Sequence, residues 1–423
     1  MRVRLLIRQG PPYGGGVLVA AGSPPAPQWV RRRHLLPALV AAALFAGGCE
    51  QRGAGTLDAA HALAEAAKRQ LAPVSEADRR AYLRRAHIFE RVDVAARDLA
   101  VGPRDPYGAA PDALVSCRFV EPKKEHVPSR GTTPKFFCEL RHVHPHVEVK
   151  VRYGRDNREL YGEVLGSRLL WALGVAVDRD YPVRVRCHDC PEDPWRPYRD
   201  FPARDDSPRR TRELDDAVMQ RLYPAAVIEA RDDEGWSFGE LDSVDAAAGG
   251  APKAEVDALR LLAAFIAHGD DKPSNQRLVC RFDDIDAAGR CAAPRLLIAD
   301  LGATFGRGAS RVFGLIDRDA RPSFAAWSTL PVWDDAAACR AHLSARDSAS
   351  SPVVSEAGRR LLAERLSALS DRQLRDLFTV ARVERMGEVT RGSDGNARPV
   401  TVDDWVAAFK RRRAALVDNH CPE

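Results

Sequence analysis

Apolar residues recur at two different spacings along this chain, and the spacing changes near its middle. In the first half they alternate with polar residues or form short runs, which predicts strands over 113–122, 134–140, 147–154, 177–187 and 223–233. In the second half they recur every three to four positions, which predicts helices over 254–268, 354–369, 370–383 and 401–417. One further helix, 157–174, begins near a capping Asn and ends at a Gly within the strand-rich half.

A short polar loop with candidate chemistry follows the helix predicted over 254–268. The loop HGDDKPSN contains Asp270, Lys272 and Asn275 and leads into a predicted strand over 275–282. Asp300 follows downstream in IADLG, at the end of a second predicted strand over 294–300. Phosphoryl transfer needs a carboxylate for the attacking hydroxyl, a cation for the phosphoryl oxygens, and Asn and carboxylate oxygens for Mg²⁺. Asp270 and Lys272 are therefore the candidate catalytic residues, and Asn275 and Asp300 the candidate metal ligands.

This loop resembles the catalytic loop of the protein-kinase-like superfamily. HGDxxxxN is similar to the loop of the aminoglycoside-phosphotransferase and choline-kinase branch, DxKPxN is similar to the protein-kinase loop, and DLG stands for DFG. The resemblance covers residues 255–306. It implies an α+β, two-lobed fold with a β-rich N-lobe at 106–245 and a helical C-lobe at 246–423. It also implies ATP or another nucleotide, with Mg²⁺ or Mn²⁺, as cofactors.

The same resemblance implies a phosphate clamp in the N-lobe. A strand lysine followed by a helix glutamate is the order of the kinase Lys–Glu pair, and Lys150 and Glu163 are the pair that we expect. Glu159, one turn earlier on the same helix face, is the rival acid, and Lys135 is the competing lysine.

Two other segments of the N-lobe are candidates for nucleotide contacts. The turn SRGTTP has no GxGxxG pattern, but backbone N–H groups of Gly131, Thr132 and Thr133 can cradle a phosphate there. An ordinary hairpin explains the turn equally well. Glu229, in the strand expected to lead to the hinge between the lobes, is expected to offer backbone groups to adenine.

The first 48 residues have the composition of a secretion signal. They contain six Arg, no Lys and no acidic residue, and Arg31–Arg33 precede the apolar run LLPALVAAALFAGG. The run is too short for a comfortable membrane span. The ending AGGC resembles a bacterial lipobox, which implies a lipid on Cys49 and export to a membrane surface, although the Arg pairs also resemble a twin-arginine signal. Residues 49–105, Ala- and Arg-rich, are expected to form a helical tether.

Charge argues against a nucleic-acid partner. The chain has 64 basic and 59 acidic residues, but without the six Arg of the leader the balance is 58 to 59. The Arg411–Arg413 run lies on a predicted helix and is interpreted as a solvated face.

Eight cysteines remain once Cys49 is assigned to lipid, and an even count in an exported chain predicts disulfides. Local pairing gives Cys117–Cys138, Cys187–Cys190, Cys280–Cys291 and Cys339–Cys421, although the sequence alone does not fix the connectivity. CHDC, at Cys187–Cys190, also fits half a zinc site or a redox pair, and HVHPH (His142, His144 and His146) has a spacing that can chelate metal.

These observations support an exported, kinase-like phosphotransferase that acts on an unknown hydroxyl or amine acceptor. Two alternatives stay open. One is a catalytically inactive, pseudokinase-like binding lipoprotein, which the missing Gly-rich loop favours. The other is a nucleotidyl transferase, which would keep the metal ligands on the same scaffold and rearrange the phosphate clamp.

Overall fold

The protein combines a strand-rich part and a helix-rich part, so the α+β class expected from the sequence is confirmed. The computed structural model describes residues 70–105, 108–124, 126, 133–141, 147–232, 234–307, 321–343 and 351–422. Cys49, Gly131, Thr132 and the HVHPH histidines lie outside these residues, so the calls made on them stay predictions.

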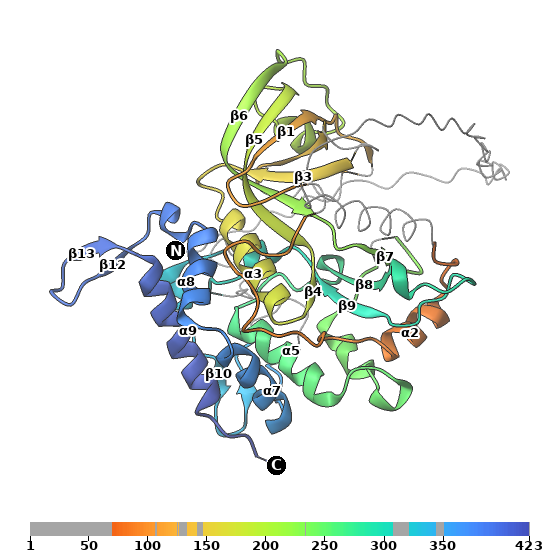
Figure 1. The fold of residues 1–423 in the computed structure, drawn as a ribbon, viewed down its shortest axis with the longest axis vertical. Coiled ribbons are helices and arrows are strands. Elements are labelled where there is room, and N and C mark those ends of the chain that lie inside the picture. Colours follow the sequence, from red (N-terminus) through yellow and green to blue (C-terminus); the bar gives the residue numbers. More distant parts are fainter. Residues whose placement is uncertain are drawn as a thin grey trace, which may run out of the picture. The chain divides into compact units, whose positions relative to one another are not determined.

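A closed five-stranded barrel forms the strand-rich part (Figure 1). Its strands, in spatial order, are β1 (Leu114–Phe119), β2 (Lys135–Leu140), β3 (Val147–Tyr153), β6 (Arg210–Arg221) and β5 (Arg179–Cys190). β1 and β5 close the barrel in parallel, while the other neighbours are antiparallel. Phe136, Val151, Val183 and Met219 point inward and form an apolar core of their own. Along β3, inward-pointing apolar residues alternate with polar ones, and this alternation predicted the strand from the sequence.

A second sheet lies in the helix-rich part, in the order β4-β9-β8-β7. Its strands are β4 (Ala176–Val177), β9 (Arg295–Ile298), β8 (Gln276–Arg281) and β7 (Ala225–Val227). The longer helices of this part are α5 (Lys253–Phe265), α7 (Glu356–Ser367), α8 (Asp371–Val380) and α9 (Val402–Val417). They share one large apolar core that is separate from the barrel core. Two cores give the chain a two-lobed organisation.

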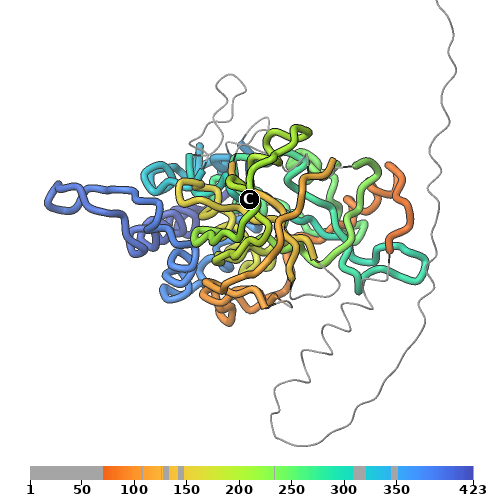
Figure 2. The backbone as a smooth tube through the Cα atoms, turned by 90° about the horizontal axis from the view of Figure 1, so that it is seen from above, coloured from red at the N-terminus to blue at the C-terminus, as the bar shows by residue number. Residues whose placement is uncertain are grey.

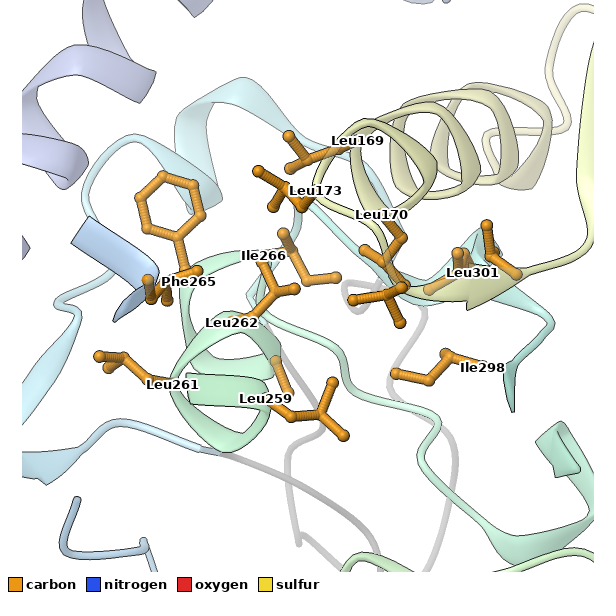
Figure 3. Close-up of a cluster of buried hydrophobic side chains, with 14 of the residues drawn as sticks. Leu169, Leu170, Leu173, Leu259, Leu261, Leu262, Phe265, Ile266, Ile298 and Leu301 are labelled. Carbon is orange, nitrogen blue, oxygen red and sulfur yellow. The ribbon is translucent and has the colours of Figure 1, made fainter. Parts of the chain in front are cut away.

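Helix α3 (Glu159–Ala172) follows a barrel strand in sequence but packs into the larger core. Its residues Leu169 and Leu170, with Leu173 just beyond it, lie beside Leu259 and Leu262 of α5 (Figure 3). The helix is buried almost all round, and it therefore lies between the two parts of the molecule as an internal element.

Smaller elements complete the described residues. They are α2 (Glu76–Arg84), α4 (Arg196–Arg199), α6 (Phe324–Trp327), β10 (Trp333–Asp335), β11 (Arg340–Ala341), β12 (Val389–Arg391) and β13 (Ala397–Pro399). The hairpin β12–β13 projects from the helical part beyond α8 and α9, as the tube view also shows (Figure 2). None of the helices in the described part of the chain is long and apolar enough to cross a membrane.

The boundary between the two parts differs from the one expected at residue 245. The strand that leaves the barrel is β6, whose polar first half hid it in the sequence, and the strand expected over 223–233 shortens to β7. Ile228, Trp236 and Phe238 already belong to the larger core. The barrel therefore ends near Arg221, because the chain after it pairs with β8.

Residues 70–105, expected to form part of a helical tether, are built into the helical part instead. Leu83, Ile88 and Leu99 are buried in the larger core. The backbone N–H of His87 donates to Pro294 (2.8 Å), and that of Leu296 donates to His87 (3.0 Å). A tether would be exposed, so the described portion of 49–105 is part of the folded unit.

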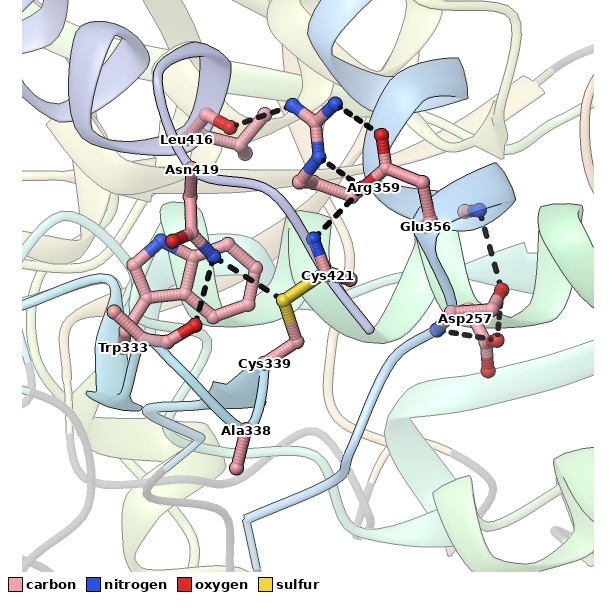
Figure 4. Close-up of a disulfide and its surroundings, with 12 residues drawn as sticks. Asp257, Trp333, Ala338, Cys339, Glu356, Arg359, Leu416, Asn419 and Cys421 are labelled. Carbon is pink, nitrogen blue, oxygen red and sulfur yellow. Dashed lines mark hydrogen bonds and ion pairs between the residues drawn. A yellow bond between two sulfur atoms is a disulfide. The ribbon is translucent and has the colours of Figure 1, made fainter. Parts of the chain in front are cut away.

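All four disulfides follow the local pairing: Cys117–Cys138, Cys187–Cys190, Cys280–Cys291 and Cys339–Cys421. The bond between Cys187 and Cys190 leaves no thiolate there for zinc. The Cys339–Cys421 bond ties the chain after α9 to the region before α7 (Figure 4). Four disulfides fit an oxidising environment.

One of the three consecutive arginines on α9 is not the solvated residue that the sequence indicated. Arg412 is 4 % exposed, and its guanidinium group donates to the carbonyl oxygens of Ala264 and Phe265 at the end of α5. It also lies over the rings of Phe265 and Trp327. A cation at these carbonyl oxygens stabilises the carboxyl end of α5, where the candidate catalytic loop begins.

Candidate active site

The candidate catalytic loop and the Asp300 turn lie side by side at the end of α5. Gly269 donates its backbone N–H to Ala303 (3.0 Å), and Ala299 donates to Asn275 (2.8 Å). These two bonds join the loop before β8 to the turn after β9. The pairing of Gln276 with Ile298 in adjacent strands continues the same contact.

Within the loop, one ion pair and one hydrogen bond connect Asp270, Lys272 and Asn275. The Lys272 ammonium group lies 2.9 Å from the Asp270 carboxylate, and the Asn275 amide donates to the Asp270 carbonyl oxygen at 2.8 Å. Asp270 is 20 % exposed and Lys272 37 %. The sequence-predicted trio is therefore brought together, with its charged ends at the surface of the loop.

Asp300 has a backbone conformation that side-chain-bearing residues adopt rarely, with φ of 53° and ψ of 60°. Such strain persists only where the surroundings enforce it, and it concentrates at functional sites. Here the enforcing neighbour is α3, because a Cβ added at Gly162 would lie 2.7 Å from the carbonyl oxygen of Gly302. The two glycines let the helix lie directly against the turn, and Glu163 Oε2 accepts the backbone N–H of Leu301 at 3.1 Å.

Arg152 is the central cation of this site, and the sequence reasoning missed it. Its guanidinium group lies 2.6 Å from Glu163 and 3.0 Å from Asp300, with Asp180 at 3.8 Å. Arg152 is fully buried. The expected partner of Glu163, Lys150, has no hydrogen bond or ion pair to a described residue. In the structure Glu163 thus lies against the predicted strand, β3, but its partner there is Arg152 instead of Lys150.

Lys150 nevertheless belongs to the same polar face of the barrel. It lies opposite Gln220 of β6, which lies opposite Asp180 of β5, while Arg152 lies opposite Lys135 of β2. Side chains directly opposite in antiparallel strands point to the same face. Because the two rival lysines and Arg152 share this face, the sequence signal that could have found Arg152 is its two-residue spacing from Lys150.

The charges around Asp300 keep it ionised. Burial by itself raises the pKa of Asp300, but the positive charges of Arg152, Lys150 and Lys135 outweigh it and hold the pKa well below the usual range. Asp300 keeps 37 % of its side-chain surface exposed, unlike Glu163 and Asp180. It is therefore the anion of the cluster that a metal ion could reach.

The pKa values of the two neighbouring carboxyl groups shift in the opposite direction, upward. Burial raises the pKa of Glu163 well above its usual value despite the attraction of Arg152, and burial raises the pKa of Asp180 to about 7. Burial and repulsion from Arg152 lower the pKa of Lys150 to about 8. The cations Arg152, Lys150 and Lys135 offset the charge of these carboxyl groups, and the opposite pKa shifts make Asp300 the most acidic of the three.

Two other predicted residues lie at the edges of this cluster. Glu159 accepts a hydrogen bond from Thr133 (2.5 Å) and pairs with Arg321 (3.4 Å), so it is not the partner of the strand cation. Glu229 follows β7, and the residue before it, Ile228, donates its backbone N–H to Leu278 of β8 (2.7 Å). Glu229 therefore lies along β8, on the approach to the catalytic loop.

Asn275 and Asp300 are the residues that could hold a metal ion. In the described residues, no group of three or more His, Cys, Asp or Glu side chains is arranged to hold one. Mg²⁺ commonly takes one or two protein ligands and completes its shell with phosphates and water. A shared site of Asn275 and Asp300 stays a prediction that fits this donor set.

His268, the first residue of the loop, is expected to limit stability in acid. It is 1 % exposed, neither ring nitrogen has a hydrogen-bond partner among the described residues, and burial lowers its pKa to about 4. The unfolded chain takes up a proton near pH 6.5, whereas the folded protein does so only near pH 4. The contribution of His268 to the free energy of unfolding is therefore fully present above pH 6.5, and it falls by about 3 kcal/mol as the pH drops to 4.

Urea unfolding between pH 4 and 7 tests this expectation. The slope of stability against pH should flatten in His268→Asn and stay unchanged in the control His87→Asn, which alters a partly exposed histidine. A slope in His268→Asn equal to that of the wild type would show that His268 is not the group responsible.

No protein-family model and no curated protein matches the sequence. Among solved structures, the chain is similar to the crystal structure of the Helicobacter pylori proinflammatory kinase CtkA, with 6 % identity and a TM-score of 0.34. The similarity covers 73 % of this chain and 96 % of that one. At this TM-score the likeness does not assign the chain to the family of that kinase.

Proposed function

We propose that this protein is an exported, kinase-like phosphotransferase that uses ATP or another nucleotide with Mg²⁺ or Mn²⁺. One observation carries the proposal: the loop of Asp270 and Asn275 is joined by backbone hydrogen bonds to the turn of an ionised Asp300. A base, a metal ligand on each loop and a nearby cation are what transfer to a hydroxyl or amine requires.

Each residue would then have a defined task. Asp270 would accept the proton of the attacking group, and Lys272 would offset charge on the transferred phosphoryl group. Asn275 and Asp300 would hold the metal ion, which neutralises phosphate charge when bound. Arg152, rather than Lys150, would link Glu163 to Asp300, which leaves Lys150 and Lys135 as the cations free to face phosphates.

A membrane anchor on Cys49 is part of this proposal. The four disulfides fit an oxidising compartment, and such compartments hold little ATP, so the natural donor can be another phosphorylated nucleotide. The acceptor is then a molecule at or outside a bacterial membrane, and nucleic acid is not expected as a partner.

Thermal-shift and transfer assays on the purified protein test the proposal. We expect ATP with Mg²⁺ or Mn²⁺ to raise the melting temperature and to support transfer. Asp270→Asn should lower the transfer rate at least about 100-fold while nucleotide still binds, because a general base contributes about 10²–10⁴-fold. Asp403→Asn, an exposed change on α9, is the control. A melting temperature that no nucleotide raises would contradict the proposal.

The second candidate is a binding protein without transferase activity. The 3.0 Å contact of Arg152 with Asp300 favours it, because a guanidinium group at this distance competes with a metal ion for the same carboxylate. Nucleotide binding without any transfer would be its signature. A nucleotidyl transferase is the third candidate function. Mass spectrometry of a modified acceptor would distinguish an added phosphoryl group from an added nucleotide.

A further inference from the structure

A cavity of about 280 Å³ lies where the chain passes between the barrel and the second sheet, and we infer that it binds a small molecule that joins a carboxylate or phosphate to an apolar group. Its wall includes the rings of Trp171, Tyr223 and Phe282 and the cations Arg97, Arg179 and Arg281. A volume near about 300 Å³, the lower end for ligand pockets, fits a small molecule. The inference goes beyond the proposed function, because none of these residues belongs to the candidate active site.

Two crossings of the chain form part of the cavity wall. Val177 ends β4 and Arg179 begins β5, while Tyr223 and Pro224 connect β6 with β7. The two crossings lie side by side, because Arg179 is opposite Arg221 in the antiparallel pair of β5 and β6. One bound molecule could therefore contact both of these connections.

Arg97 is the cation that is most available to a ligand. Its guanidinium carbon lies 4.5 Å from the ring centroid of Trp171, near the end of α3, and its side chain has no hydrogen bond or ion pair to a described residue. An aromatic face attracts a cation without using the N–H groups of that cation. The stack therefore orients the guanidinium group and leaves its terminal N–H donors for a carboxylate or phosphate, which arginine binds through two parallel hydrogen bonds.

The two acids in the lining have partners of their own. Glu90 lies 3.3 Å from the guanidinium group of Arg295 and accepts a hydrogen bond from the Tyr223 hydroxyl group (3.3 Å). Asp283 pairs with Arg281 at 3.5 Å, and its side chain is 68 % exposed. These contacts account for the negative charge of the lining without involving Arg97.

Arg179 is a second cation without an acidic partner in the described residues. Its guanidinium group donates to the backbone carbonyl oxygen of Arg104 (3.2 Å), which is a neutral acceptor. Arg97 and Arg179 together give the cavity positive charge that favours an anion and disfavours a cation. Because the rings of Trp171 and Phe282 supply an apolar wall, we expect the bound molecule to carry an apolar group beside its charge.

Calorimetric titration of the whole protein with a matched set of small molecules tests this site. Phenylacetate and phenyl phosphate both carry a ring and distinguish a carboxylate from a phosphate. Acetate lacks the ring, and benzyl alcohol and phenethylamine lack the negative charge. We expect at least one ring-bearing anion to bind, and the three comparators to bind at least about 10-fold more weakly. Arg97→Gln and Arg179→Gln should each weaken binding about 10-fold or more, because each removes a charged partner.

The matched control is Arg91→Gln, which removes an exposed arginine beside Glu90 that does not line the cavity, and it should leave the affinity unchanged. Arg97→Lys and Arg179→Lys keep the charge and should retain more affinity than the Gln variants, which separates loss of charge from loss of folding. Equal affinity in the wild type and both Gln variants, or no binding of either ring-bearing anion, would overturn the inference. Phenethylamine binding as tightly as the anions would overturn it as well.

Discussion

Replacing Arg152 with methionine is expected to lower the free energy of unfolding by about 3–5 kcal/mol, the range found when one partner of a buried ion pair is removed. The reason is electrostatic. Arg152 is fully buried and is the cation in contact with Glu163, Asp300 and Asp180, so its removal leaves three carboxyl groups around an apolar side chain.

The pH dependence of this loss identifies its cause. Without the guanidinium group the pKa values of Glu163 and Asp180 in the folded protein rise further above those of the unfolded chain, and the pKa of Asp300 rises from its lowered value. The loss of stability in Arg152→Met, relative to the wild type, should therefore be small at low pH, where the carboxyl groups are protonated, and should grow as the pH rises toward 8. Urea unfolding at pH 5 and pH 8 measures this difference.

Two variants serve as controls for Arg152→Met. Arg152→Lys keeps the charge but cannot reach Glu163 and Asp300 with a fork of donors, so it should recover part of the stability. Lys150→Met removes a cation that has no ion pair to a described residue and should cost much less. Equal losses for Arg152→Met and Lys150→Met would contradict the central place of Arg152.

Removing the Cys339–Cys421 disulfide is expected to cost about 4–5 kcal/mol, because the bond closes a loop with a sequence separation of 82 residues. The bond holds the chain end after α9 in place. Near it, Cys421 donates its backbone N–H to Glu356 (2.9 Å), as Figure 4 shows. Asn419 donates to the Ala336 carbonyl oxygen (3.0 Å). Without the disulfide, no covalent bond holds the chain after α9 in the position that these two hydrogen bonds require.

The matched control is the Cys187–Cys190 bond, whose separation is 3 residues. Loop-closure entropy predicts about 2 kcal/mol for it, and both pairs are buried, so a double Cys→Ser change costs similar packing in each. Denaturant unfolding of Cys339→Ser/Cys421→Ser beside Cys187→Ser/Cys190→Ser measures the difference. A larger loss for the short loop would refute the argument from loop length.

The sequence predicted the elements whose patterns are local. The order of α5, the loop at 268–275, β8, β9 and Asp300 follows from helical spacing and short apolar runs, and the four disulfides follow from proximity in sequence. β6 was missed because half of it is exposed and polar, so its strand character comes from pairing with β5 and β3.

Residues whose roles depend on tertiary contacts could not be predicted. Lys150 and Arg152 are both basic and share one face of β3, and only the position of α3 decides which of them meets Glu163. Arg412 looked like a surface arginine because its partners are backbone carbonyl oxygens of α5, far away in sequence. Residues 70–105 have weak apolar spacing and became part of the core through bridges to Arg295 and Val175.

The position of α3 makes the site sensitive to how the barrel is oriented. Arg152 moves with the barrel, whereas Glu163 and the Asp300 turn are fixed to the larger core through the leucines of α3 (Figure 3) and the close approach of Gly162 to Gly302. A rotation of the barrel would change the distances from Arg152 to Glu163 and Asp300, because these residues belong to different parts of the molecule. The charge balance at Asp300 therefore depends on the placement of the barrel, which carries the arginine that neutralises it.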